Sequence, residues 1–363
     1  MTRKPNRIFV SRGPGETRAA LVADERVIEI VHVRDAEAQT GAVYAGRVID
    51  RVPNADALFV EIGVGPPGVL DAKDQNLAKG RMVAVEVATP ARAEKGHKLK
   101  PSKAAIPEAM KTPGLITAAP DAAAGWWCRY KEHIVEIVAE QAAQRQRLAG
   151  LLGAAAPIVD AAANDMTFAE IDEQVDAALA SVVVLPSGGR LVIEQTAALV
   201  AIDIDAGASS IVQTNTEAMT ELARQIRLRN LAGHIVVDLI HTKGPQRFVA
   251  ALKEACADDP AETRIMGLTP SGMIDIVRRR VRPSLAEALY GPHTVAYRAL
   301  RLACRELVGR RVAKVELRVA PTVAAALNEQ LNAAMLEARD TAKGEIVVVP
   351  QASFAEARIE VGA

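Results

Sequence analysis

The chain has 363 residues, of which 50% are hydrophobic and 24% are charged, and its 44 basic side chains balance 44 acidic ones. This length suffices for two or three domains with separate cores, and no apolar run approaches the roughly 18 residues that a membrane-spanning helix needs. The composition excludes an integral membrane protein with such a helix. The balanced charge neither indicates nor excludes a nucleic-acid ligand.

The N-terminus and the cysteines indicate a cytoplasmic protein. The basic start is followed by only a short apolar stretch, Ile8-Phe9-Val10, too short for the hydrophobic region of a signal peptide. Cys128, Cys256 and Cys304 stand far apart, without a histidine at zinc-ligand spacing. We therefore expect neither a disulfide framework nor a structural zinc site.

Short apolar runs separated by turn residues predict a β-rich N-terminal part. Strands are expected over 7–10, 17–23 and 26–31, then over 43–48, 57–62, 68–70 and 82–87. Because the second group packs short strands closely along the chain, we expect a small closed barrel, of which the OB fold is the commonest RNA-binding form. Residues 88–125 show little periodicity and predict a linker or a reduced subdomain.

Beyond this linker the pattern changes first to helix and then to alternating strands and helices. Residues 126–180 are predicted to be helical. Strands over 191–193, 198–202 and 235–237, with a helix over about 215–230, predict an α/β layer with a largely buried sheet. The tail predicts a separate small α+β domain, with helices over 293–308 and 321–336 and strands over 315–319, 346–349 and 357–361.

Three aspartates carry the chemistry that these patterns predict. Asp203 and Asp205 end an apolar strand two residues apart, so their side chains point to the same face of the sheet. Asp238 lies in the next apolar run, and if the two strands are adjacent and parallel, Asp203 and Asp238 reach comparable heights. Carboxylates among such apolar residues are costly to ionise without a cation. Mg²⁺ fits best, since it is commonly held by one or two carboxylates plus phosphate oxygens.

Periodicity alone leaves a structural alternative open, in which these aspartates cap strand ends, pair with arginines or begin a turn. The helix between the two strands favours a site. Its start resembles a capping box at 214–217, and Arg224, Arg227 and Arg229 load its C-terminal half with positive charge, where capping of the helix dipole is the alternative role. A second basic run over 278–282 follows an apolar helix pattern and suits phosphate contacts, or else a solvated helix face.

Several segments together resemble the ribonuclease E/G family. They are Leu-Pro-Ser-Gly-Gly-Arg at 185–190 with its continuation to 205, the segments 215–218 and 221–238, Arg-Arg-Arg-Val-Arg-Pro-Ser-Leu at 278–285, and Gly-Glu-Thr-Arg at 15–18. The resemblance implies a Mg²⁺-dependent endoribonuclease acting on single-stranded RNA, in RNA processing such as rRNA maturation or in messenger decay. The alternative is a non-catalytic, RNA-binding paralogue that kept the scaffold.

The resemblance also assigns roles to individual residues. The two aspartates that hold the catalytic Mg²⁺ in the family fall on Asp203 and Asp238, and Asp205 stands where the family has asparagine. The aromatic that the family uses against RNA bases falls on Phe59, and its lysine after the barrel on Lys95. We add Arg224, Arg227 and Arg280 as candidate RNA-binding residues.

The sequence also departs from the family pattern. The family's second aromatic falls on Val69, a downstream arginine falls on Pro270, and the stretch between 207 and 215 is shortened. The pair that senses a 5′-monophosphate has no match around 114–118, and residues 288–293 lack the zinc-linking cysteines. A homo-oligomer, if formed, is therefore not expected to be zinc-linked.

The resemblance predicts a multidomain α/β and β architecture. It consists of an RNase H-like sheet with an inserted OB-fold (S1-type) barrel, a DNase I-like catalytic α/β domain and a small C-terminal α+β domain. The expected boundaries are 1–38 and 126–182 for the RNase H-like parts, 39–100 for the barrel, 101–125 for a reduced linker or vestigial sensor region, 183–290 for the catalytic domain and 291–363 for the C-terminal domain.

Overall fold

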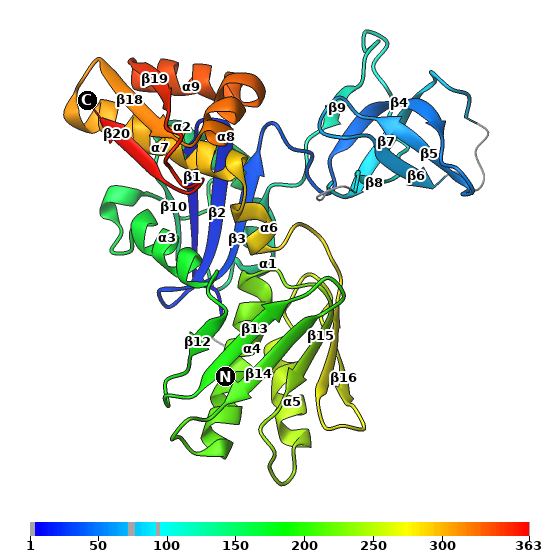
Figure 1. Ribbon diagram of the computed structural model, residues 1–363, viewed down its shortest axis with the longest axis vertical. Helices are drawn as coiled ribbons and strands as arrows, with labels where there is room; N and C mark the ends of the chain where they lie inside the picture. The colour runs from blue at the N-terminus through cyan, green and yellow to red at the C-terminus, as the bar shows by residue number, and fades with distance from the viewer. Residues whose placement is uncertain (1–3, 72–76, 92–94, 363) are drawn as a thin grey trace.

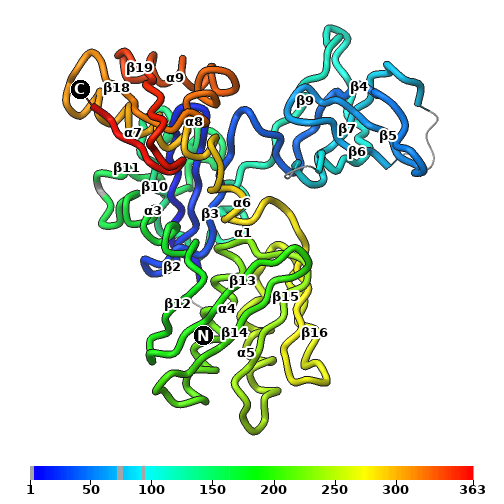
Figure 2. The backbone as a smooth tube through the Cα atoms, in the orientation of Figure 1, coloured from blue at the N-terminus to red at the C-terminus, as the bar shows by residue number. Residues whose placement is uncertain are grey.

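A computed structural model describes residues 4–71, 77–91 and 95–362, with the side chain of Ala163 left out. Within these residues the strands form four sheets, each with its own apolar core or cores. Figure 1 shows a central sheet, a barrel held to one side of it, a helix-backed sheet at the opposite end from the C-terminal unit, and that C-terminal unit packed near the top of the central sheet. The backbone trace in Figure 2 follows the same arrangement.

The central sheet has the strand order β11-β10-β1-β2-β3. Its strands are β1 (Arg7–Gly13), β2 (Glu16–Ala23), β3 (Arg26–Arg34), β10 (Glu136–Ala139) and β11 (Ile158–Asp160). Helices α1 (Ala122–Tyr130) and α2 (Ala142–Leu152) cover one face, and α3 (Phe168–Ala177), preceded by the 3-10 turn η1 (Ala161–Ala163), covers the other. Alternate residues of β1 enter the two cores, Phe9 on the α3 side and Ile8 and Val10 on the α1 side, which is why this strand is apolar throughout.

The barrel is closed by five strands, because β4 pairs with both β5 and β7. The strands are β4 (Val43–Arg51), β5 (Ala57–Glu61), β6 (Gly68–Asp71), β7 (Met82–Thr89) and β8 (Lys98–Pro101), and β9 (Gly114–Thr117) adds to β4. The chain enters and leaves the barrel by two connections that touch. Gly41, at φ 86°, lies so close to the second connection that a Cβ there would be 3.0 Å from Cδ of Pro120.

The sheet that carries the aspartates has the order β12-β13-β14-β15-β17-β16. Its strands are β12 (Val182–Val184), β13 (Arg190–Gln195), β14 (Val200–Asp205), β15 (Gly233–Asp238), β16 (Arg264–Leu268) and β17 (Ile274–Arg278). Helices α4 (Ile211–Leu228) and α5 (Gln246–Ala255) pack on one face, and their apolar stripes meet the inward side chains of the strands in one core. Alternate strand residues point away from these helices.

The C-terminal unit joins three strands to helices that cover them. It contains α7 (Pro292–Arg310), β18 (Lys314–Val319), α8 (Pro321–Ala325), the π-helix η2 (Ala326–Gln330), α9 (Asn332–Ala342), β19 (Glu345–Pro350) and β20 (Ile359–Gly362). Helix α6 (Leu285–Leu289) precedes this unit and packs on the core of the central sheet. Charged contacts tie it to the central sheet, because Arg301 of α7 pairs with the buried Glu16, and Glu337 of α9 pairs with Arg12 at 2.9 Å.

Most predicted strands are confirmed, but three local predictions are wrong. Residues 126–180 contain β10 and β11, because the apolar run of β10 is paired with β1 and buried on both faces. The pattern before the second basic run is strand β17, not helix, since Ile274 and Ile276 alternate with residues of the other face. Helix α4 begins at Ile211, so the segment 214–217 lies inside the helix instead of capping it.

The expected linker is partly structured, since β9 comes from within it and joins the barrel sheet. In the part of the chain that the structure describes, none of the helices has the length and apolar character required to cross a membrane.

Candidate active site on the open sheet face

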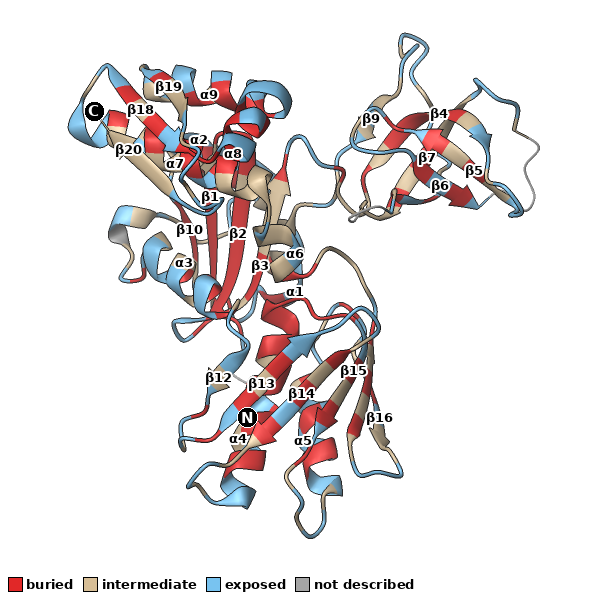
Figure 3. Cartoon of the chain, viewed as in Figure 1, coloured by how far each residue is buried: buried red, intermediate tan, exposed pale blue. Residues whose placement is uncertain are grey.

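The two predicted metal ligands lie side by side on neighbouring strands. Strands β14 and β15 are parallel, and their register places Asp203 directly opposite Asp238, as the sequence predicts. Ile202 and Val237 point into the helix-backed core, so both aspartates occupy the opposite face and are exposed. The alternation of buried and exposed residues along this sheet can be followed in Figure 3.

This exposure changes the physical reason for expecting a cation. The sequence argument rested on burial of the carboxylates, which the structure contradicts for Asp203 and Asp238. Paired positions on adjacent strands are about 4.8 Å apart, so two like charges face each other. No hydrogen bond or ion pair is found for either carboxylate within residues 4–71, 77–91 and 95–362. Repulsion between them therefore favours a bound cation.

Asp205 shares this face but has protein partners. Its carboxylate pairs with Arg190 at 2.7 Å and accepts a hydrogen bond from the backbone N–H of Gly207 at 2.8 Å. The Gly207 N–H, and then Arg190, lower the pKa of Asp205. The structural alternative of pairing with an arginine thus holds for Asp205, and not for Asp203 or Asp238.

Asn215 is a site residue that the sequence analysis gave no role. It is fully buried in α4, and its side-chain Nδ2 donates to the carbonyl of Ile240 at 2.9 Å, two residues beyond Asp238. This hydrogen bond fixes the end of β15 against the helix. A polar residue on the otherwise apolar, inward side of a predicted helix is the signal that could have identified it.

The residues present fit a hydrated Mg²⁺ ion. The described residues contain no group of three or more histidine, cysteine, aspartate or glutamate side chains arranged to hold a metal, so the protein offers a carboxylate pair and not a full cage. Mg²⁺ is usually bound in this way, by one or two carboxylates with waters and substrate phosphates completing its shell. Asp203 and Asp238 are the residues that would hold it.

The expected RNA-contacting residues of the barrel are at its surface. Phe59 is half-buried, pairs across the strands with Val69 and is not part of the barrel core, which contains its neighbours Leu58 and Val60. Phe59 therefore does not serve as a core residue of the barrel. Lys95 is exposed just before β8.

We expect Phe59→Ala to weaken binding of single-stranded RNA by about 1 to 3 kcal/mol, the usual effect of losing one base-stacking aromatic. Because the ring lies outside the core, the melting temperature should change little. Titration of a fluorescently labelled oligonucleotide against both proteins measures the effect, with Val69→Ala as the control. Equal affinities would remove Phe59 from the RNA path.

The three arginines chosen as RNA contacts are engaged within the protein. Arg227 is buried and pairs with Glu29 at 2.7 Å, and Arg224 binds Glu221 at 2.7 Å. Arg280 is half-exposed and pairs with Glu287 at 3.1 Å. The arginines of α4 thus join the helix to the central sheet, and only Arg280 keeps a surface position suited to a phosphate.

The fold and the site define a mixed α/β protein with a closed barrel and a carboxylate pair on an open sheet face. A sequence model of the ribonuclease E/G family matches residues 86–281, which is more than half of the chain. The chain therefore belongs to the ribonuclease E/G family.

Curated relatives agree with this assignment. Ribonuclease G of Salmonella typhimurium (strain SL1344) is 36% identical over 131 residues, covering 33% of this chain and 27% of the relative. Ribonuclease E of Escherichia coli (strain K12) is 39% identical over 131 residues, covering 33% of this chain and 12% of the relative. Ribonuclease E of Buchnera aphidicola is 31% identical over 209 residues, covering 51% and 23%. The chain thus matches between 12% and 27% of the length of these relatives.

Proposed function

We propose that the protein is a Mg²⁺-dependent endoribonuclease that hydrolyses single-stranded RNA in RNA processing or decay. The observation that carries the proposal is the register of Asp203 with Asp238 on an exposed sheet face, where neither carboxylate has a protein partner in the described residues. Family membership and relatives named ribonuclease G and ribonuclease E support the reaction class. A protein that only bound RNA would gain nothing from two clustered carboxylates facing a polyanion.

Different side chains would have different roles in such a reaction. A bound Mg²⁺ would polarise the phosphodiester and lower the pKa of the attacking water. Asp203 and Asp238 would hold the ion, Asn215 keeps the end of β15 in place, and Arg190 holds the third carboxylate, Asp205, by an ion pair. Phe59, Lys95 and Arg280 would contact the RNA, the first by stacking on a base.

We extend the proposal to the domain layout and the setting of the protein. The five-stranded central sheet would correspond to the RNase H-like part, the closed barrel to the OB-fold insertion and the helix-backed sheet to the DNase I-like catalytic domain. The protein would act in the cytoplasm, and any homo-oligomer would form without a zinc link.

The direct test is incubation of the purified protein with a labelled single-stranded RNA, once with Mg²⁺ and once with EDTA. We expect cleavage to internal fragments with Mg²⁺ and none with EDTA. Binding without cleavage under both conditions would instead identify the non-catalytic paralogue. Cleavage that persists in EDTA would contradict the proposed Mg²⁺ dependence, although the protein would still be a nuclease.

A further prediction concerns the ends of the RNA and zinc. Because the sequence lacks a match to the pair that senses a 5′-monophosphate, we expect 5′-monophosphorylated, 5′-hydroxyl and circular RNAs to be cut at similar rates. A tenfold preference for the monophosphate, worth about 1.4 kcal/mol in the transition state, would reveal a sensor. Light scattering with and without a zinc chelator should give one unchanged mass.

A further inference from the structure

Arg190 lies on the same open sheet face as the carboxylate pair. It is the first residue of β13, which runs antiparallel to β14 with Arg190 opposite Asp205. The next residue, Leu191, is buried in the helix-backed core, so Arg190 points to the other face, which Asp203 and Asp205 share. Diagonal neighbours on adjacent strands are about 7 to 8 Å apart, a distance that long side chains can span. Arg190 is therefore within reach of a group bound at Asp203.

One end of the Arg190 guanidinium is held in place, and the rest of it is free. Nη2 donates to Oδ2 of Asp205 at 2.7 Å, and Oδ1 of Asp205 accepts from the backbone N–H of Gly207 at 2.8 Å. A guanidinium has five N–H donors, and no other hydrogen bond of Arg190 is found within residues 4–71, 77–91 and 95–362. Since the side chain is 55% exposed, its remaining donors are open to a substrate.

Stability gives little reason for this ion pair, because pairs between exposed side chains contribute little to folding. The pair instead places a positive charge among carboxylates that a polyanion must approach. Strands β13, β14 and β15, which the structure describes in full, carry no other arginine or lysine. An RNA phosphate bound at Asp203 and Asp238 would thus meet a single arginine from these strands, Arg190.

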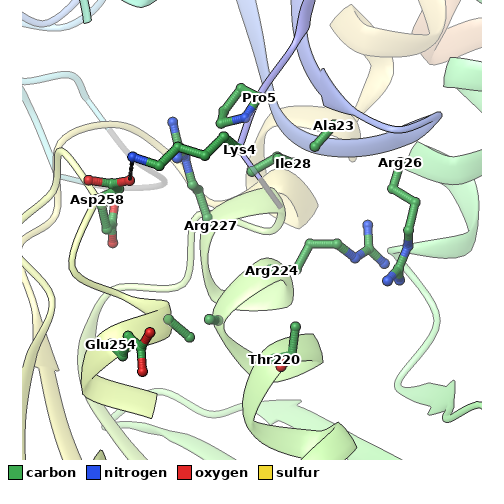
Figure 4. A pocket seen from close by; sticks show the side chains of 13 residues that line it. Lys4, Pro5, Ala23, Arg26, Ile28, Thr220, Arg224, Arg227, Glu254 and Asp258 are labelled. Carbon is green, nitrogen blue, oxygen red and sulfur yellow. Dashed lines mark ion pairs between the residues drawn. The ribbon is translucent and has the colours of Figure 1, made fainter. Parts of the chain in front are cut away.

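The arginines of α4 cannot make this contact. Helix α4 packs on the core face of the sheet, opposite the carboxylate pair. Its Arg224 and Arg227 line a cavity between α4, α5 and the β2–β3 hairpin, which Figure 4 shows. Both are paired there, with Glu221 and Glu29, so they are directed away from the open face.

Hydrolysis of a phosphodiester develops charge that a fixed donor can stabilise. The water oxygen forms a bond to phosphorus while one bond from phosphorus to a ribose oxygen breaks. One proton of the water passes to the released ribose oxygen, and the other stays on the new phosphate hydroxyl. Negative charge builds up on the non-bridging phosphate oxygens, where preorganised donors act most strongly. Arg190 would donate hydrogen bonds there and transfer no proton, because guanidinium groups stay charged in proteins.

We propose that Arg190 is a catalytic residue that donates to a non-bridging oxygen of the scissile phosphate, and that Asp205 is the positioning residue that holds its guanidinium. This inference rests on the proposed nuclease function. The competing role is charge balance, in which Arg190 only neutralises Asp205 beside the carboxylate pair. The two roles predict different results when both side chains are removed.

The test is single-turnover cleavage of a labelled single-stranded RNA by the full chain at saturating protein and Mg²⁺. Arg190→Ala should cut about a hundredfold more slowly, the usual effect of losing one donor to a developing negative charge. Asp205→Ala should cut about tenfold more slowly, because a catalytic group that is no longer held in position loses part of its effect. The double variant should be as slow as Arg190→Ala alone, since Asp205 acts through Arg190. Charge balance predicts instead that the double variant recovers the normal rate.

Arg264→Ala is the matched control. Arg264 is 73% exposed on the edge strand β16, and its neighbour Ile265 enters the core, so this change removes an arginine from the same open face. Its cleavage rate should be normal. Fluorescence anisotropy of the same RNA in EDTA gives a readout without cleavage. Arg190→Ala should bind within about threefold of the unmodified protein, because a contact made in the transition state affects the rate and not the affinity.

Circular dichroism of each variant checks that it is folded, which we expect because Arg190 and Asp205 are both at the surface. A normal rate for Arg190→Ala, recovery of the rate in the double variant, or a loss confined to RNA affinity would overturn the role of Arg190 and leave the nuclease function standing. An unmodified protein that binds the RNA but does not cut it with Mg²⁺ would overturn the nuclease function and this inference together.

Discussion

Asp203→Asn and Asp238→Asn are each expected to abolish Mg²⁺-dependent RNA cleavage while the protein stays folded. Each change removes one charge from the facing pair and therefore weakens the only metal site that we propose. An ion in such a site contributes several kcal/mol of charge stabilisation in the transition state. Since about 1.4 kcal/mol corresponds to a factor of ten in rate, cleavage should fall by about a hundredfold or more.

The matched control is Glu194→Gln, which removes an exposed carboxylate from β13 of the same sheet. Single-turnover cleavage of a labelled RNA, measured over a range of Mg²⁺ concentrations, separates a lost metal site from a weakened one. Thermal unfolding of the three variants should coincide with that of the unmodified protein. If either aspartate variant cut RNA at the normal rate, the carboxylate pair would not be the active site.

A second large effect is expected at Glu29, far from the carboxylate pair. Its buried carboxylate on β3 accepts from Arg227 of α4 at 2.7 Å and from Arg282 at 2.6 Å. Glu29→Gln leaves the guanidinium of Arg227 buried without its carboxylate, and breaking a buried pair in this way costs about 3 to 5 kcal/mol. Urea unfolding followed by circular dichroism should show this loss, and Glu25→Gln, exposed in the neighbouring turn, should show almost none.

The same pair makes stability depend on pH. Burial alone would raise the pKa of Glu29, but the charges of Arg282 and Arg227 outweigh burial and hold its pKa below the usual value. A carboxyl with a lowered pKa in the folded state stabilises the protein above the unfolded pKa, about 4.3 for glutamate, and this contribution is lost as the pH falls further. The stability difference between the unmodified protein and Glu29→Gln should therefore be full at pH 7 and shrink below about pH 4. A difference that stays constant down to pH 3 would contradict the ion-pair explanation.

The sequence predicted the carboxylate pair because its signal is local. Two apolar strands that each reach an aspartate, with one helix between them, leave few arrangements other than parallel neighbours. The observed register of Asp203 with Asp238 follows from this rule. Their exposure could not be predicted in the same way, because alternation along β14 does not show which face the helices cover.

The roles of the arginines were beyond sequence reasoning for a different reason. A run of positive charge on a helix looks the same whether its partner is RNA or a distant carboxylate. The partner of Arg227 is Glu29, 198 positions away in the sequence, and no local pattern connects them. The capping box predicted at 214–217 failed for a similar reason: Glu217 accepts a hydrogen bond from the backbone N–H of Ser187, outside the helix, at 2.9 Å.

The touching connections of the barrel bear on how the central sheet is assembled. Ser11 on β1 binds Glu140 beyond β10 across 129 positions of sequence, a span that would make loop closure entropically expensive for a flexible chain. Gly41 and Pro120 lie against each other at the base of the barrel, so once the barrel has folded it joins two nearby points and the effective loop becomes short. Early folding of the barrel would thereby lower the entropic barrier to pairing β1 with β10. For the same reason, a variant in which a short turn replaces the whole barrel should still pair these two strands.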